Sequence, residues 1–233
     1  METTVQPTEF ERKKTSYFSR FALGHLRDMR ILRKGGVLGK ENRDWRNISE
    51  HAIVEAVGAD ILAEALNTNR EDVIQAANLH DWYKRREVEM MKKLGGAQGH
   101  AVTAVEDKRL LHEYGVPPHI VKLAHSNIPD SIDREYLSSR TLEEKIMHYM
   151  DLITSGSDFM NFRDRINIVA QEKHNVEFSD SFRDKYGGKS LFEVQEEVAQ
   201  LEESEFEKLL GVPSGGVIQF IRKKLEERIN AQE

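Results

Sequence analysis

The sequence predicts an all-α protein, and three observations support this class. Apolar residues recur at the three-to-four-residue spacing of a helix in one segment after another along the 233 residues. The strict alternation of apolar and polar residues that indicates a half-buried strand is scarce. Glycine and proline fall mainly between the helical segments, where they end or begin helices.

The first two predicted helices lie in the N-terminal part of the chain. After a stretch with the composition of a disordered terminus, a helix is expected over residues 8–33, ending at a glycine pair and followed by a polar, basic loop. Asn47, with Glu50 three residues later, resembles a capping box that opens a helix to about residue 66. His51 lies in the first turn of that helix.

The next helix, expected over residues 69–79, carries apolar residues on one face and ends at the pair His80-Asp81. Further on, Thr141 and Glu144 form a second capping box, which opens a helix that carries Asp151. The remaining helices are expected over residues 84–93, 99–114, 158–174, 179–186, 189–210 and 214–231, and a short helix is expected to begin at Pro117-Pro118 and to end at His125.

Composition excludes several classes of function. The 39% hydrophobic and 32% charged residues are ordinary for a globular protein with a sizeable core. Because the chain contains no cysteine, thiolate metal sites and cysteine nucleophiles are excluded, and any metal must be held by His, Asp or Glu. No apolar run approaches the roughly 18 residues of a membrane span, and no signal segment is evident. We therefore expect a cytoplasmic protein without a membrane partner.

Charge is unevenly distributed along the chain. The net charge of −6 argues against broad nucleic-acid binding. Residues 11–46 nevertheless contain 11 Lys or Arg against 4 Asp or Glu, whereas residues 189–233 contain 6 basic and 10 acidic residues. The basic segment either attracts a phosphate-bearing substrate or forms a solvated helix face, and the sequence leaves both open.

The pair His80-Asp81 is the most informative feature, because a buried helix seldom turns two adjacent polar groups inward without a partner for them. A divalent metal is one such partner, since imidazole nitrogen and carboxylate oxygen are both good ligands. A His-Asp hydrogen bond that closes the helix end is the alternative. His51 and Asp151 also lie where amphipathic helices turn toward a shared core, and we expect the four residues to meet.

The order H…HD…D, formed by His51, His80-Asp81 and Asp151, resembles the HD-domain metal-dependent phosphohydrolase superfamily. The resemblance covers about residues 45–156 and implies a helical bundle in which these four residues bind a divalent metal. The family's common continuation Ile-Gly-Lys is here Trp82-Tyr83-Lys84, so that the lysine is kept and a bulky residue replaces glycine. We accordingly expect a basic N-terminal helix and loop over 1–44, the metal-binding core over 45–156, and a C-terminal helical extension over 157–233 packed on the core.

Some branches of the superfamily hold two metals and add two histidines, and His100 and His125 fall at positions similar to those extra ligands. The alternative is that His100 is a polar residue at a helix start and that His125 is a buried histidine bonded to the backbone. One or two metal ions are therefore expected, and the ligand types suit Mn, Fe, Co, Ni or Zn without choosing between them. The other histidines, including His148, are expected to be structural or exposed.

The resemblance implies a metal-activated water that cleaves a phosphomonoester or phosphoanhydride of a nucleotide-like small molecule. Asp81 and Lys84 are the expected catalytic residues, and Lys84 with Arg43 and Arg46 is expected to bind the substrate phosphate. Two alternatives stay open, namely a nucleotide-sensing module that keeps its metal without turnover and a metal-dependent oxygenase. Trp82 and its neighbouring aromatic residues are expected in the core or a lid rather than against a base. The acidic, amphipathic tail is expected to pack on the bundle or on a second subunit of a homodimer.

Overall fold

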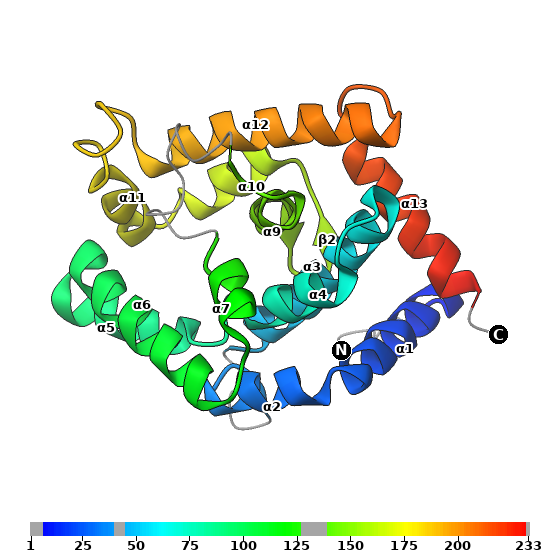
Figure 1. Cartoon of the computed structure of the whole chain (residues 1–233), viewed down its shortest axis with the longest axis horizontal. Coiled ribbons are helices and arrows are strands. Elements are labelled where there is room, and N and C mark those ends of the chain that lie inside the picture. The colour runs from blue at the N-terminus through cyan, green and yellow to red at the C-terminus, as the bar shows by residue number, and fades with distance from the viewer. Residues whose placement is uncertain (1–6, 40–44, 127–138, 232–233) are drawn as a thin grey trace, which may run out of the picture.

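The computed structural model describes residues 7–39, 45–126 and 139–231, and within these ranges the regular secondary structure is almost entirely helical, as predicted (Figure 1). None of the helices in these ranges combines the length and the apolar character needed to cross a bilayer. In chain order, the elements are α1 (Glu9–Gly24), α2 (Leu26–Lys34), α3 (Arg46–Leu66), α4 (Arg70–Leu79), α5 (Lys84–Leu94), α6 (Gly96–Glu113), α7 (Pro118–Ala124), α9 (Leu142–Ile153), β1 (Thr154–Ser155), β2 (Asp158–Phe159), α10 (Phe162–Val169), α11 (Lys173–Asp180), α12 (Leu191–Leu210) and α13 (Val217–Asn230).

The main hydrophobic core surrounds α3 and α9. Helix α9 runs through the middle of the molecule, with α12 across one side of it and α3 and α4 on another (Figure 1). One continuous cluster of buried side chains includes Tyr17 of α1, Tyr149 of α9, Phe206 of α12 and Ile229 of α13. The N-terminal and C-terminal helices therefore share one core with the segment over 45–156 instead of forming separate cores.

A second core lies around Trp82, whose side chain is 1% exposed. It joins α2, the end of α4, α6 and α7 through apolar residues that include Leu32, Leu79, Leu111 and Ile120. The indole Nε1 donates a hydrogen bond to Asp107 over 2.5 Å. The expectation that Trp82 belongs to the core or to a lid is therefore confirmed for the core.

The helix ends follow local signals in some places and not in others. The capping box of Thr141 and Glu144 is confirmed, because the Thr141 hydroxyl accepts from the Glu144 amide and the Glu144 carboxylate accepts from the Thr141 amide. The capping box expected at Asn47 is wrong. Helix α3 already begins at Arg46, and Trp45 precedes it without a side-chain cap.

Three predicted helices differ from the structure. The one expected over 179–186 is wrong, because α11 (Lys173–Asp180) ends at the start of that range and turns follow it. The helix expected over 8–33 is divided at His25, whose ψ of 42° lies outside the helical range, so that α1 packs against α3 and α13 while α2 packs against α4. The helix expected over 158–174 is replaced at its start by the antiparallel hairpin β1–β2. Asn161 then caps α10 by accepting a hydrogen bond from the Arg163 amide over 2.9 Å.

Candidate metal centre

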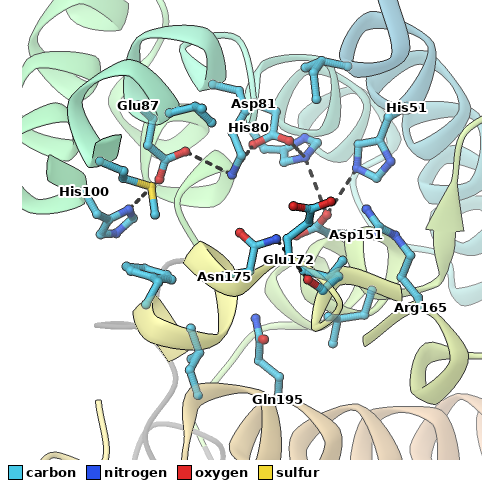
Figure 2. A pocket seen from close by; sticks show the side chains of 18 of the residues that line it. His51, His80, Asp81, Glu87, His100, Asp151, Arg165, Glu172, Asn175 and Gln195 are labelled. Atoms are coloured by element: carbon cyan, nitrogen blue, oxygen red, sulfur yellow. Dashed lines mark hydrogen bonds and ion pairs between the residues drawn. The ribbon is translucent and has the colours of Figure 1, made fainter. Parts of the chain in front are cut away.

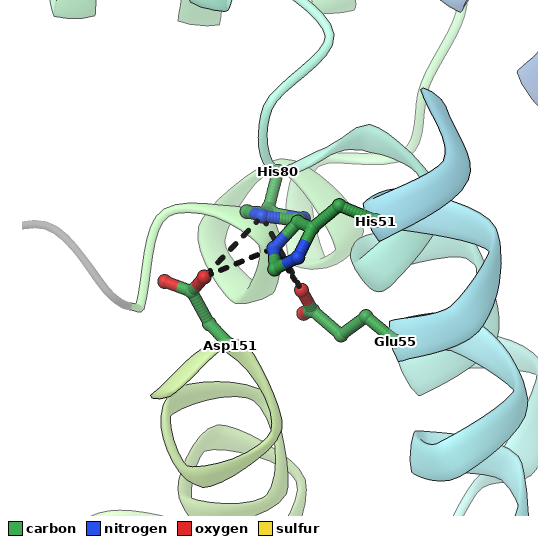
Figure 3. Close-up of side chains that lie close together, drawn as sticks. All are labelled: His51, Glu55, His80 and Asp151. Carbon is green, nitrogen blue, oxygen red and sulfur yellow. Dashed lines mark hydrogen bonds and ion pairs between the residues drawn. The ribbon is translucent and has the colours of Figure 1, made fainter. Parts of the chain in front are cut away.

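Four side chains from three elements converge on one point inside the bundle. His51 and Glu55 come from α3, His80 follows the last residue of α4, and Asp151 lies near the end of α9 (Figure 3). Each contributes one donor atom, and these four atoms all lie within 4.8 Å of one another. A group of two imidazole nitrogens and two carboxylate oxygens at this spacing is a candidate site for a divalent cation.

The positions of the donors follow from close helix packing. His51 and Glu55 are one turn apart on α3 and therefore share a face. Gly58, one turn further along, lies in close contact with the neighbouring elements, because a Cβ atom at this position would collide with the terminal methyl of Met150 and with the ring of Phe159. Met150 precedes Asp151, so this close contact is next to the ligand-bearing part of α9.

The distances between the donor atoms are short, yet several of the atoms are not hydrogen-bonded. His51 Nε2 lies 3.2 Å from Asp151 Oδ1 and 3.2 Å from Glu55 Oε2. His80 Nε2 lies 3.3 Å from the same Glu55 oxygen and 3.8 Å from Asp151 Oδ1. Both Glu55 oxygens and His80 Nε2 are buried without a hydrogen bond to any described residue. Buried polar atoms are normally satisfied, so donors that face one another in this way fit a shared cation.

The tautomer of His80 fits this arrangement. Its Nδ1 lies 2.8 Å from the carbonyl oxygen of Ala77, which can only accept a hydrogen bond. Nδ1 therefore carries a proton and donates it, and in the neutral ring the lone pair is on Nε2, the atom that faces Glu55 and Asp151. A hydrogen bond from the far ring nitrogen to a backbone carbonyl is the usual support of a metal-binding histidine.

Without a metal, the cluster is a set of buried charge pairs. Burial opposes the charge on His51, but its hydrogen bond to Asp151 and the nearby carboxylate of Glu55 outweigh this effect and raise its pKa to about 9. Burial also opposes the charge on Asp151, yet its hydrogen bond with His51 and the charge of His80 lower its pKa to about 2. Burial raises the pKa of Glu55. A metal ion would take the place of the imidazole protons in neutralising the two carboxylates.

Asp81, expected as a metal ligand, is not among these four donors; it lies beside the cluster and begins a chain of charged contacts. Its Oδ2 is 3.5 Å from His80 Nε2, and its Oδ1 is 3.6 Å from Lys84 Nζ. Lys84 Nζ is also 3.0 Å from Glu87 Oε2, and the other Glu87 oxygen is 2.6 Å from His100 Nδ1 (Figure 2). The charges of Asp81 and Glu87 raise the pKa of Lys84, and despite burial the nearby Lys84 and His100 lower that of Glu87 to about 2. Lys84 is thus a fully charged cation next to the cluster.

The two added histidines lie outside the four-residue cluster. His100 is bound to Glu87, as described above, and His125 has Nδ1 2.7 Å from the Val121 carbonyl and Nε2 3.0 Å from Asp107 Oδ2. With both ring nitrogens engaged, His125 has the backbone-bonded role that was its alternative. The expectation of a second metal held by His100 and His125 therefore has no matching set of donors among the described residues.

His148, expected to be structural, faces away from the cluster, with its Nδ1 2.7 Å from Glu202 Oε2 on α12. Arg43 lies outside the described residues, as does the side chain of Arg46, so the structure gives neither a role.

The cluster opens into a cavity of about 600 Å³. Lys84, Glu87, His100 and His125 line one wall, and the opposite wall comes from helices α10, α11 and α12. Figure 2 shows Arg165, Asn175 and Gln195 of this second wall directed into the cavity.

The chain matches no family model, no curated protein and no solved structure. The geometry of the cluster and of its cavity is therefore the basis for inferring a function.

Two residues of this centre were not predicted from the sequence, namely Glu55 and Glu87. Glu55 had a signal, because it follows His51 by four residues and lies between buried alanine and valine positions, where an unpaired carboxylate is costly. The only feature of the sequence that points to Glu87 is its position three residues after Lys84. Asp107 also has a structural role, since its two carboxylate oxygens pair with Trp82 Nε1 and His125 Nε2.

Proposed function

We propose that the chain is a metal-dependent phosphohydrolase of the HD type, acting on a phosphate-bearing small molecule. The observation that carries the proposal is the convergence of His51, Glu55, His80 and Asp151 at the inner end of a cavity, beside the charged side chain of Lys84. The donor set includes three residues of the H…HD…D order, and Glu55 supplies a further carboxylate.

A divalent ion held by these four residues would lower the pKa of a bound water toward neutrality. The chain's own groups supply the rest of the chemistry. Lys84, whose pKa is raised by Asp81 and Glu87, stays protonated and can stabilise a phosphate oxygen or the charge on the leaving group. Asp81, kept ionised by Lys84 and His80 against the effect of burial, can accept a hydrogen bond from the attacking water and orient it.

The cavity supports a small substrate. Its volume of about 600 Å³ is within the range of sites that enclose small organic ligands, and a nucleotide-like molecule fits this range. The wall contains both charged and aromatic side chains, including Tyr83 and Phe178, so a phosphate and an organic group can be bound together. The donor types suit Mn, Fe, Co, Ni or Zn and do not choose between them.

The test is release of inorganic phosphate from a panel of nucleotides and small phosphoesters, with added Mn²⁺ and with a chelator. We expect turnover that requires the metal and disappears in Asp151→Asn. Asp164→Asn, an exposed acid of α10, is the matched control and should keep full activity. Tight binding of one nucleotide without turnover under any metal would replace the hydrolase with the sensing module.

A further inference from the structure

The second wall of the cavity belongs to the C-terminal helices, for which the family resemblance implied no functional residue. We infer that Arg165 of α10 binds the substrate phosphate opposite Lys84, and that the amides of Asn175 and Gln195 select the organic part of the substrate. This inference deepens the proposed phosphohydrolase function and rests on it. The substrate class that it names is a phosphate ester of an uncharged, hydrogen-bonding organic group.

Arg165 is held in place by the same helix that carries Asp151. Its Nε donates to the carbonyl oxygen of Thr154 over 3.0 Å, and Thr154 is the fully buried C-cap of α9, three residues after Asp151. In Figure 2 the guanidinium points toward the side of the cavity where His51 and Asp151 lie. The charge is therefore positioned relative to the metal cluster before any ligand binds, which reduces the entropy lost on binding.

The hydrogen-bonding capacity of Arg165 is largely unused. Within the part of the chain that the structure describes, its side chain makes the one bond to Thr154 and no ion pair, so both Nη groups are left without a protein acceptor. Lys84, across the cavity, already contacts two carboxylates. A guanidinium offers two parallel donors that match the oxygens of a phosphate, which makes Arg165 the better placed of the two cations to bind the anion.

The amides lie further along the same wall. Asn175 Nδ2 donates to the Val169 carbonyl over 3.0 Å, which fixes the amide and leaves its Oδ1 as an acceptor. Gln195 of α12 has no hydrogen bond from its side chain to any described residue, so both of its polar atoms are available. Buried or half-buried amides favour a ligand that can pair with them and reject one that cannot.

Two neighbouring side chains narrow the ligand class. The ring of Phe178 lines the cavity and lies 5.1 Å from the ring of His100, so an apolar surface is available beside the amides. Glu172, the N-cap residue of α11, also lines the cavity and is drawn near Asp151 and Arg165 in Figure 2; its negative charge disfavours a second anionic group on the ligand. The favoured organic part is therefore neutral, with polar edges and an apolar face.

The phosphate contact is tested by calorimetric titration of inorganic phosphate into the Mn²⁺-loaded protein. Arg165→Gln should weaken phosphate binding at least tenfold while metal stoichiometry and helical content stay at the wild-type values. Arg163→Gln is the matched control, because Arg163 is on the same helix but pairs with Glu196 on the exposed surface, 2.7 Å away. It should change phosphate affinity less than twofold.

Arg165→Lys keeps the charge without the paired donors and should give an intermediate affinity. It is also the comparison to use if Arg165→Gln fails to fold. Wild-type phosphate affinity in both Arg165 variants, or a wild-type protein that binds no phosphate, would overturn the inference. Phosphate binding that depends on Arg165 without turnover of any ester would instead count against the proposed hydrolase and leave the anion site in place.

The amide part is tested with Gln195→Leu. It should lower kcat/KM for the best organic phosphate about tenfold and leave the affinity for inorganic phosphate unchanged, because Gln195 lies beyond the phosphate site. An unchanged kcat/KM would contradict the role in selection. An equal loss of kcat/KM for the organic phosphate and of affinity for inorganic phosphate would show a general effect on the cavity. That result would also contradict the role of Gln195 in selection.

Discussion

Replacing Glu55 with glutamine tests whether Glu55 is a metal ligand or only a member of a structural ion pair. The Glu55 side chain is 0% exposed, and its Oε2 lies 3.2 Å from His51 and 3.3 Å from His80. Glutamine has nearly the same shape but lacks the charge and one of the two acceptor oxygens. If Glu55 is a metal ligand, the substitution should weaken metal affinity by at least about 100-fold, or about 2.7 kcal/mol.

The expected change in thermal stability follows from this loss. At a metal concentration of about 1,000 times the wild-type Kd, binding stabilises the folded state by about 4.1 kcal/mol. A Kd 100-fold weaker leaves about 1.4 kcal/mol at the same concentration. For a chain of this size the difference of about 2.7 kcal/mol corresponds to a melting temperature roughly 5–11 °C lower in the presence of metal. The metal-free proteins should differ by less than about 1 kcal/mol at pH 8, since the two histidines can lose their protons when the carboxylate is removed.

The assay is calorimetric titration of Mn²⁺ together with thermal melts of the metal-free and metal-loaded proteins. Glu64→Gln is the matched control on the same helix, because Glu64 is exposed and pairs with Arg70 and Arg228 at the surface. It should leave metal affinity unchanged and cost at most about 1 kcal/mol. Wild-type metal affinity in Glu55→Gln, or a metal-free protein destabilised by several kcal/mol, would refute the assignment of Glu55 as a ligand.

Three further predictions follow from the described contacts. His80→Ala should abolish metal binding and retain the helical content, measured by metal analysis and circular dichroism. The pKa of His51 is raised to about 9 in the metal-free chain, so below that pH a metal ion must displace a proton from His51 in order to bind. The affinity for Mn²⁺ should therefore rise from pH 6.5 to pH 8.5. An affinity that does not change with pH would contradict the role of His51 as a ligand. Burial raises the pKa of Asp60, but hydrogen bonds from Arg70 and Arg228 outweigh it and lower the pKa. The stability that Asp60 contributes is thus present above about pH 4 and is lost as the pH falls further, so Asp60→Asn should cost roughly 1–3 kcal/mol at pH 7 and flatten the acid branch of urea unfolding measured between pH 3 and pH 7.

The sequence predicts the helix ends that depend on local chemistry. Thr141 and Glu144 satisfy the first amides of α9, and Gly211 adopts a positive φ of 66° after α12, so both ends are visible as short patterns. The break at His25 has no comparable signal, because it arises from α1 and α2 packing against different helices. The hairpin β1–β2 is missed since two-residue strands are too short to show an alternating pattern.

The candidate site is predictable to a similar degree. His51, His80 and Asp151 are brought together as the sequence analysis expects, and metal binding by them stays a prediction. Glu55 is missed because a glutamate one turn after a histidine is more often a solvated partner on a helix surface. The wall that contains Arg165 depends on how α10 to α12 fold back over the core, which no local pattern of residues specifies.

The most direct test of the metal centre is the metal content of the purified protein, measured after saturation with Mn²⁺ and removal of free ions by dialysis. The geometry predicts one tightly bound ion per chain in the wild type and none in a variant that carries both His51→Ala and Asp151→Ala. A wild-type protein that retains no ion, or a double variant that retains a full equivalent, would contradict the assignment of His51, Glu55, His80 and Asp151 as a metal site.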